Sequence, residues 1–142
     1  MKYLLDTDHA SILDWPQGSD YAILCLNLSM HGTDEVGISV VSFQEQMLGA
    51  NSHVSSAKNS KALLRGYELM AGIIDHYRTF PIVPFDHSAL EIFDRLKSSR
   101  IKIPTMDLRI AAIALANDLT LVTRNRRDFE LVEGLRLEDW TK

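Results

Sequence analysis

The sequence predicts an α/β fold of three layers, with a parallel sheet of four to five strands flanked by helices. Three apolar runs at residues 2–6, 36–41 and 119–123 have the length of buried strands, and the second is rich in β-branched residues. Segments whose apolar residues recur at helical spacing separate these runs. Strands that alternate with helices pair in parallel through right-handed crossovers, which places helices on both faces of the sheet.

The first half of the chain predicts four helices around two strands. A helix follows the first strand over residues 10–15, and a second covers residues 21–30 and closes at a His-Gly pair. Ser42 follows the second strand and is the expected N-cap of the next helix, with Glu45 three residues later. Small and polar residues predict a loop over 51–60, before a long helix over about 61–77.

The second half predicts two helices and the remaining strands. Two prolines bound an extended segment at 81–84, which suits a short edge strand. Asp86 and Ser88 open a helix that ends in a basic run at 95–102. Thr105 is the expected cap of a helix that is apolar on every side over 110–116 and is therefore buried. The last predicted strands are residues 119–123 and a short apolar segment at 135–137, which closes the chain.

Composition indicates one globular domain over residues 1–142, with 46% hydrophobic residues and a net charge of −4. The single Cys25 cannot form a disulfide within the chain, and no Cys or His spacing suits zinc. This indicates a reducing compartment, and the cytoplasm is the expected location. The N-terminal apolar run meets Asp6 too early for a signal peptide or a membrane span, so we expect no membrane association.

The charges are unevenly distributed along the chain. The net negative charge argues against attraction of nucleic acid to the whole surface. More than half of the 15 cations nevertheless lie between positions 95 and 127. They are Arg95, Lys97, Arg100, Lys102, Arg109, Arg124, Arg126 and Arg127. A local basic patch is therefore compatible with the acidic total.

Acidic and polar residues follow three of the predicted strands. Asp6 ends the first strand, Glu45 lies shortly after the second, and a polar stretch at 124–128 follows the strand at 119–123. Ligands of open parallel sheets bind outside the carboxyl ends of the strands. Asp107 begins the buried helix and heads its apolar stripe, so its side chain points along the face that packs on the sheet. We therefore expect these carboxylates to converge at one edge.

Each acid also has a purely structural interpretation. Glu45 could complete a capping box with Ser42, and Asp107 could favour the positive end of its helix, each worth roughly 1 kcal/mol. Asp8 is expected to cap the first helix. Asp6 fits such a role less well, because a carboxylate directly after a buried strand is costly to bury unpaired.

Taken together, the acids predict a metal site. Two unit charges about 4 Å apart repel by roughly 4 kcal/mol at an effective dielectric of 20, so several converging carboxylates require compensation. Oxygen ligands without Cys or clustered His suit Mg²⁺ or Mn²⁺. Such a site activates water and neutralises phosphate charge, which favours phosphodiester hydrolysis.

Other catalytic classes lack their motifs here. No phosphate-binding Gly-rich loop and no nucleophile elbow are present, and the five histidines do not have metal-ligand spacing. Arg124, Arg126 and Arg127 are either solvated loop charges or, beside a carboxylate site, contacts for an RNA backbone.

Four motifs, in order and at these spacings, resemble the PIN-domain ribonucleases, specifically the VapC-type toxins of bacterial toxin–antitoxin modules. They are LLDTD at 4–8, Glu45, TMDLRIAA at 105–112 and TRNRRDF at 123–129, followed by GLRLEDW at 134–140. The resemblance spans nearly the whole chain. It implies Mg²⁺- or Mn²⁺-dependent cleavage of RNA, a homodimer and inhibition by a cognate antitoxin.

The resemblance also implies the roles of individual residues. Asp6 and Asp107 become the principal metal ligands, joined by Glu45. Family members often carry an aspartate after the last inner strand, where this chain has Asn125. We expect Asn125 to act as a neutral ligand of the metal or of water, with Asp128 as its partner.

Two alternatives to a metal-dependent endoribonuclease remain. Asp6-Thr7-Asp8 is also similar to the start of haloacid-dehalogenase phosphatases, in which the first aspartate is a nucleophile, although the Gly-Thr that follows there is missing. The chain could also be a catalytically inert binding module whose acids only cap helices.

Overall fold

The computed structural model describes all residues, 1–142. Its centre is a five-stranded sheet in the order β3-β2-β1-β4-β5, and every neighbouring pair is parallel. The predicted fold class is therefore confirmed. The strands are β1 (Tyr3–Leu5), β2 (Val36–Ser39), β3 (Ile82–Val83), β4 (Thr120–Val122) and β5 (Leu137–Glu138).

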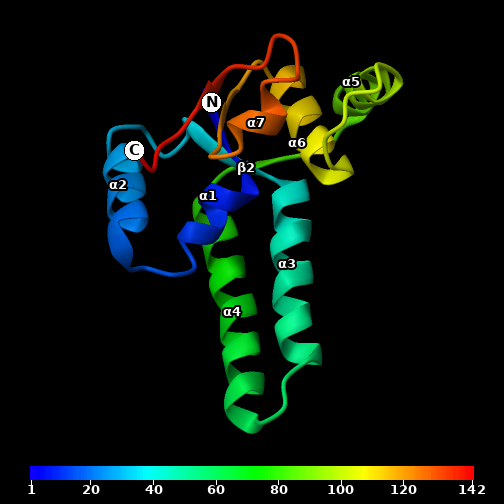
Figure 1. Ribbon diagram of the computed structural model, residues 1–142. Coiled ribbons are helices and arrows are strands. Elements are labelled where there is room, and N and C mark those ends of the chain that lie inside the picture. Colours follow the sequence, from blue (N-terminus) through cyan, green and yellow to red (C-terminus); the bar gives the residue numbers. More distant parts are fainter.

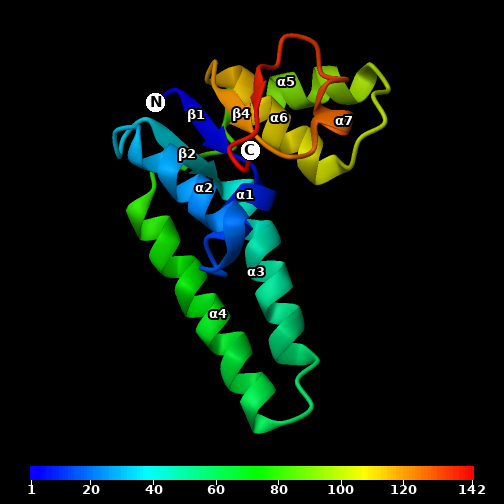
Figure 2. The ribbon, with the colours of Figure 1, turned by 60° about the vertical axis from the view of Figure 1, so that its left-hand side comes forward.

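Seven helices connect and cover the strands. They are α1 (Thr7–Ile12), α2 (Gly18–Ser29), α3 (Val40–Ser55), α4 (Ser60–Thr79), α5 (His87–Ser98), α6 (Thr105–Ala116) and α7 (Arg126–Phe129). Figures 1 and 2 show α5, α6 and α7 on one side of the sheet and α1 to α4 on the other. None of the helices combines the length and the apolar character that crossing a membrane requires.

Alternate residues of the central strands fill two separate cores. Leu4 and Leu121 pack with the apolar helix α6 and with α5 on one face. Leu5 and Val122 face the other way and pack with Ile73 of α4 and with side chains of α1, α2 and α3. Successive side chains of a strand point to opposite faces, so β1 and β4, in the middle of the sheet, are buried on both sides.

Helices α3 and α4 form a long antiparallel hairpin that projects from the body of the molecule (Figures 1 and 2). Near its tip the two helices approach closely, because Gly66 of α4 packs against Val54 of α3. At its base a buried network joins them. The Tyr77 hydroxyl donates to Gln46, which in turn donates to Asp14 after α1.

Local boundaries differ from the sequence-based prediction at several places. Ser39, not Ser42, caps α3, because its hydroxyl accepts the Ser42 N–H at 3.0 Å. Helix α3 also continues to Ser55, so the predicted loop over 51–60 shrinks to a short connection. Thr105 is the first residue of α6, and Pro104 occupies the cap position without a side-chain hydrogen bond. Helix α1 ends at Ile12 rather than at residue 15.

Candidate active site

The candidate active site lies at the carboxyl ends of β1, β2 and β4. Asp6 follows β1 directly and is 4% exposed. Its Oδ1 accepts the backbone N–H of Thr7 at 2.8 Å, which caps α1. The expectation that Asp8 caps this helix is therefore wrong, because Asp6 holds that position.

Thr123 holds the other oxygen of Asp6. It follows β4, is fully buried, and its hydroxyl donates to Asp6 Oδ2 at 2.7 Å. The same hydroxyl oxygen accepts the backbone N–H of Asn125 at 3.0 Å. Thr123 thereby connects the end of β1 to the loop before α7. The sequence placed Thr123 in a strand but gave no signal for this role.

Asp8 belongs to the site rather than to a helix cap. Its Oδ2 accepts the backbone N–H of Arg124 at 3.0 Å, and its Oδ1 lies 2.8 Å from Nδ1 of the buried His9. Sequence reasoning missed this residue, because an acid in the first turn of a helix is ordinary.

Glu45 enters the site from the second turn of α3. Its Oε1 accepts the hydroxyl hydrogen bond of Thr7 at 2.7 Å, and the Thr7 hydroxyl also lies 2.9 Å from that of Ser42. Glu45 therefore bonds to the start of α1 and does not complete a capping box on its own helix. Thr7, which sequence reasoning left without a role, links α1 to α3.

The pKa of Asp107, in the first turn of α6, is raised to about 6 by burial and then by the charges of Glu45, Asp128 and Asp8. The pKa of Asp6 is raised to about 7, first by burial, then by the charge of Asp8, with Asp107 contributing. The charges of Glu45, Asp128 and Asp8 act on Asp107, and those of Asp8 and Asp107 act on Asp6, which indicates that acids from four remote segments lie in one region. That Asp6, Glu45, Asp107 and Asp128 form one metal site stays a prediction.

Asn125 and Asp128 lie beside one another after β4. The side-chain amide of Asn125 donates to Asp128 Oδ2 at 3.0 Å. Both side chains are half-buried, and Asp128 acts electrostatically on Asp107. The amide orients the carboxylate without neutralising its charge.

A family model for the PIN domain matches residues 3–135 of this chain. The chain belongs to the PIN-domain family. It is 26% identical over 140 residues to the tRNA(fMet)-specific endonuclease VapC of Salmonella typhimurium, an alignment that covers 99% of this chain and 98% of that protein. The recognition of a PIN domain in the sequence motifs is confirmed.

Solved structures share the fold of this PIN domain. VapBC-1 from nontypeable Haemophilus influenzae superimposes with a TM-score of 0.76 at 21% identity, over 100% of both chains. A toxin–antitoxin complex from Klebsiella pneumoniae superimposes with a TM-score of 0.69 at 22% identity, over 98% of both chains.

No Lys or Arg pairs with the site carboxylates of the PIN domain. None of the ion pairs includes Asp6, Glu45, Asp107 or Asp128. The three arginines predicted to bind RNA are all exposed. Arg124 pairs with Asp20 at 2.9 Å and Arg126 with Glu130 at 3.4 Å, while Arg127 has no ion-pair partner.

The chemistry of the donor set fits a divalent cation. Every candidate ligand is an oxygen, the charges are uncompensated, and both features suit Mg²⁺ or Mn²⁺. As the side chains stand, no three acids or histidines are grouped closely enough to hold one ion. Both oxygens of Asp6 accept hydrogen bonds, from the Thr7 N–H and the Thr123 hydroxyl, whereas Glu45 accepts one only at Oε1, from the Thr7 hydroxyl.

Proposed function

We propose that this PIN domain is a metal-dependent endoribonuclease that hydrolyses RNA phosphodiesters and serves as the toxin of a toxin–antitoxin pair. The observation that carries the proposal is the group of converging carboxylates without a cationic partner at the carboxyl edge of the sheet. Family membership and the named endonuclease relative support the same chemistry.

Asp6, Glu45 and Asp107 are the residues that would hold Mg²⁺ or Mn²⁺. When bound, the ion supplies a water of lowered pKa and neutralises charge on the phosphate. Without a cation, the raised pKa of about 7 leaves Asp6 partly protonated near neutral pH, and the pKa of about 6 keeps a smaller protonated fraction on Asp107. A cation favours their ionised forms and so binds in competition with these protons.

The remaining residues position the carboxylates and the strand. Thr123 fixes Asp6, and Thr7 fixes Glu45, each through one short hydroxyl hydrogen bond. Asn125 orients Asp128 and offers a neutral amide oxygen to the metal or to water. Arg124, Arg126 and Arg127 lie on the exposed rim, where they would contact the RNA backbone.

The proposal includes partners and a location. A cognate antitoxin protein is an expected partner, as the toxin–antitoxin complex among the structural neighbours suggests. A second copy of this chain is the other expected partner. The cytoplasm, where the RNA is, is the expected location, consistent with the free thiol of Cys25.

Cleavage of a mixed RNA pool by the purified chain tests the proposal. We expect cleavage with Mg²⁺ or Mn²⁺, none with chelator, and none by Asp107→Asn, because that variant removes one ligand charge. Asp94→Asn is the matched control, since Asp94 is an exposed acid of α5 outside the site. Cleavage that persists in chelator, or at the wild-type rate in Asp107→Asn, contradicts the proposal.

A further inference from the structure

A groove leads from the carboxylate site down the face where α1 meets the α3–α4 hairpin. Its volume is about 180 Å³. Thr7 and Glu45 line its upper end and therefore belong to both the groove and the site. Gly49 and His53 line its course on α3, one helical turn apart. No side chain covers Gly49, because a Cβ built there meets nothing within 4 Å.

An exposed tryptophan forms one wall of this groove. Trp15 follows α1 and is 52% exposed, whereas the other tryptophan, Trp140, is buried. Trp15 also lines the neighbouring hollow beside Asp8 and Arg124. An indole ring that is open to solvent between two hollows offers a face on which a nucleic-acid base can stack.

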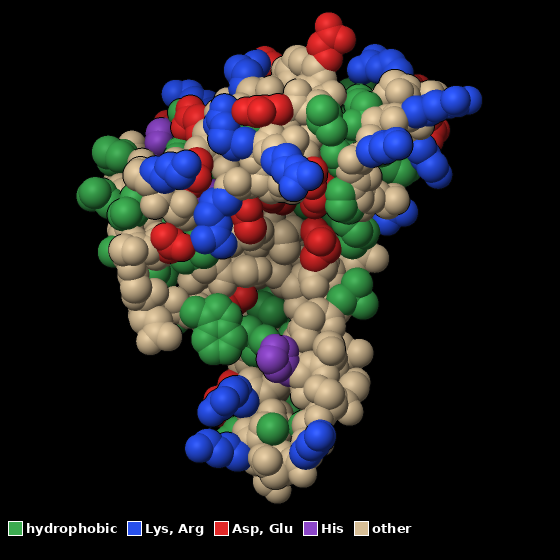
Figure 3. All heavy atoms as spheres, in the orientation of Figure 1, with side chains coloured by type: hydrophobic (Ala, Val, Ile, Leu, Met, Phe, Trp, Pro, Cys, Tyr) green, Lys and Arg blue, Asp and Glu red, His purple; other side chains and the backbone are tan.

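Beyond His53, the last α3 residue that lines the groove, the hairpin carries a basic region. The chain has no Asp or Glu between Glu45 and Glu68, although its net charge is −4. This stretch holds Lys58, Lys61 and Arg65, which are exposed and take part in no ion pair. Figure 3 shows Lys and Arg side chains at the tip of the hairpin, below a histidine and a large apolar side chain. We call these three cations the hairpin tip.

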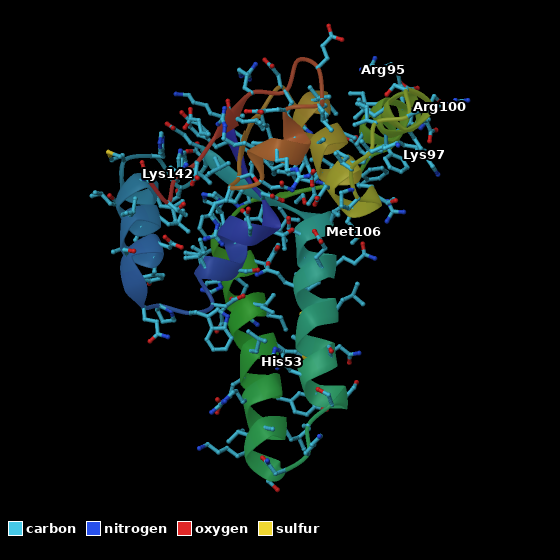
Figure 4. All side chains as sticks on the ribbon, in the orientation of Figure 1. His53, Arg95, Lys97, Arg100, Met106 and Lys142 are labelled. Carbon is cyan, nitrogen blue, oxygen red and sulfur yellow. The ribbon has the colours of Figure 1, made fainter.

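The hairpin tip lies within reach of a strand bound at the site. Glu45 and Ser55 are both on α3, and ten residues of helix span roughly 15 Å. Figure 4 shows His53 on this path, between the ribbons of α3 and α4. The order along the face is therefore carboxylates, aromatic and imidazole groups, then unpaired cations.

We propose that this face is the binding track for single-stranded RNA on one side of the cleaved bond. One base stacks on Trp15, and the hairpin tip contacts the phosphates. The inference rests on the proposed function, which brings an RNA phosphate to the carboxylates. An acidic protein segment would also be attracted to the tip, but it carries no base to stack on the exposed ring of Trp15.

Binding of a fluorescein-labelled single-stranded RNA tests the track, measured by anisotropy with chelator so that the strand stays intact. We expect Lys58→Gln/Lys61→Gln/Arg65→Gln to weaken binding and to reduce the slope of log Kd against log salt by about 2, because three phosphate contacts are lost. The matched control is Arg95→Gln/Lys97→Gln/Arg100→Gln, whose exposed cations lie on the opposite side of the molecule (Figure 4). The control keeps the wild-type slope.

Substitutions of Trp15 test whether a base stacks on its ring. Trp15→Ala should weaken binding at least about fivefold, whereas Trp15→Phe should retain most of it, because any aromatic face accepts a base. The cations of the hairpin tip are exposed, so thermal unfolding of that variant should match the wild type. Trp15 is 52% exposed, so Trp15→Ala also loses packing, and Trp15→Phe is the variant that should unfold near the wild-type temperature.

The cleavage assay tests the proposed function, and the binding assay tests the RNA track. If the wild type cuts no RNA, the proposed function fails. If it cuts RNA and the hairpin-tip variant binds RNA with the wild-type slope, the track is overturned and the proposed function stands. If that variant binds RNA normally but loses binding to a polyglutamate peptide, the tip is a protein-binding surface and the track is again overturned.

Discussion

The hydroxyl of Thr123 donates a hydrogen bond of 2.7 Å to Oδ2 of Asp6, a residue 117 positions earlier in the chain. Parallel pairing of β1 with β4, in which Leu5 lies opposite Val122, places the two residues at neighbouring strand ends. The bond is buried, and the oxygen of Thr123 also accepts the N–H of Asn125. One hydroxyl therefore sets the position of a metal-ligand candidate relative to the loop that carries Asn125.

Thr123→Val tests this relationship. The substitution keeps the shape of the side chain but leaves Asp6 Oδ2 and the Asn125 N–H without a partner. We expect a loss of about 1–3 kcal/mol in the free energy of unfolding and a lower cleavage rate. Chemical denaturation and initial cleavage rates measure the two effects.

Thr120→Val is the control in the same strand. The Thr120 hydroxyl accepts an exposed hydrogen bond from Arg136 at 3.3 Å, far from the site. Its loss should cost less than about 0.5 kcal/mol and leave cleavage unchanged. Equal effects of the two variants would show that Thr123 acts only through strand packing.

The sequence singles out the acids of the candidate site but not the residues that position them. Asp6, Glu45 and Asp107 could be proposed as ligands, because they follow strands or head a buried helix. Thr7 and Thr123 were not, since a hydroxyl becomes informative only when the parallel register brings it beside a carboxylate. Asp8 was misassigned as a cap for the same reason: its partner, the Arg124 N–H, is remote in sequence.

Stability without divalent cations should depend on pH through Asp6 and Asp107. Burial and neighbouring charges raise the pKa of Asp6 from 3.8 to about 7 and that of Asp107 to about 6. A raised folded-state pKa contributes stability that is fully present below pH 3.8 and is lost as pH rises through the folded pKa. The contribution of these two groups should therefore decline between about pH 4 and pH 7.

Asp6→Asn isolates this contribution. The amide oxygen can still accept from Thr7 and the side chain carries no charge to bury, but its nitrogen cannot accept the Thr123 hydroxyl. In chelator we therefore expect the stability of this variant relative to the wild type to rise between pH 5 and pH 8 by on the order of 2–4 kcal/mol. Urea titrations at pH 5 and pH 8 measure the difference. An equal gain at both pH values would rule out titration as its cause, and Mg²⁺ should stabilise the wild type more than the variant.

His9 ties the end of the chain to the site. It is fully buried, its Nε2 accepts the backbone N–H of Trp140 at 3.1 Å, and its Nδ1 lies 2.8 Å from Asp8. His9→Leu leaves that buried N–H unpaired and should cost about 2–3 kcal/mol of stability. His87→Leu is the control, because the His87 side chain is 84% exposed and its loss should change stability by less than about 0.5 kcal/mol. Equal losses in denaturant titrations would contradict this role.

Helix boundaries show where local signals stop being sufficient. Val40 and Val41 continue an apolar, β-branched run, so the sequence extends β2 through them. In the structure they begin α3, because the capping hydroxyl comes from Ser39 rather than from the predicted Ser42. The pairing of β2 with β3 also ends at Ser39. The projecting length of α3 and α4 was likewise not predictable, since the polar residues of 51–60 resemble a loop unless the facing helix is known.

Two glycines of α4 should respond to alanine in opposite directions. A Cβ on Gly66 would lie 2.8 Å from Val54 Cγ2 and 3.1 Å from the Val54 backbone nitrogen, so α3 and α4 would have to move apart. A Cβ on Gly72 meets nothing within 4 Å. We expect Gly66→Ala to destabilise the chain by about 1–3 kcal/mol through overpacking. Gly72→Ala should stabilise it by up to about 1 kcal/mol, because alanine favours helix. Thermal unfolding of both variants measures the sign of each change.

A gain in stability for Gly66→Ala would mean that the hairpin helices do not pack as closely as Gly66 and Val54 indicate. It would also leave the hairpin tip without a rigid support.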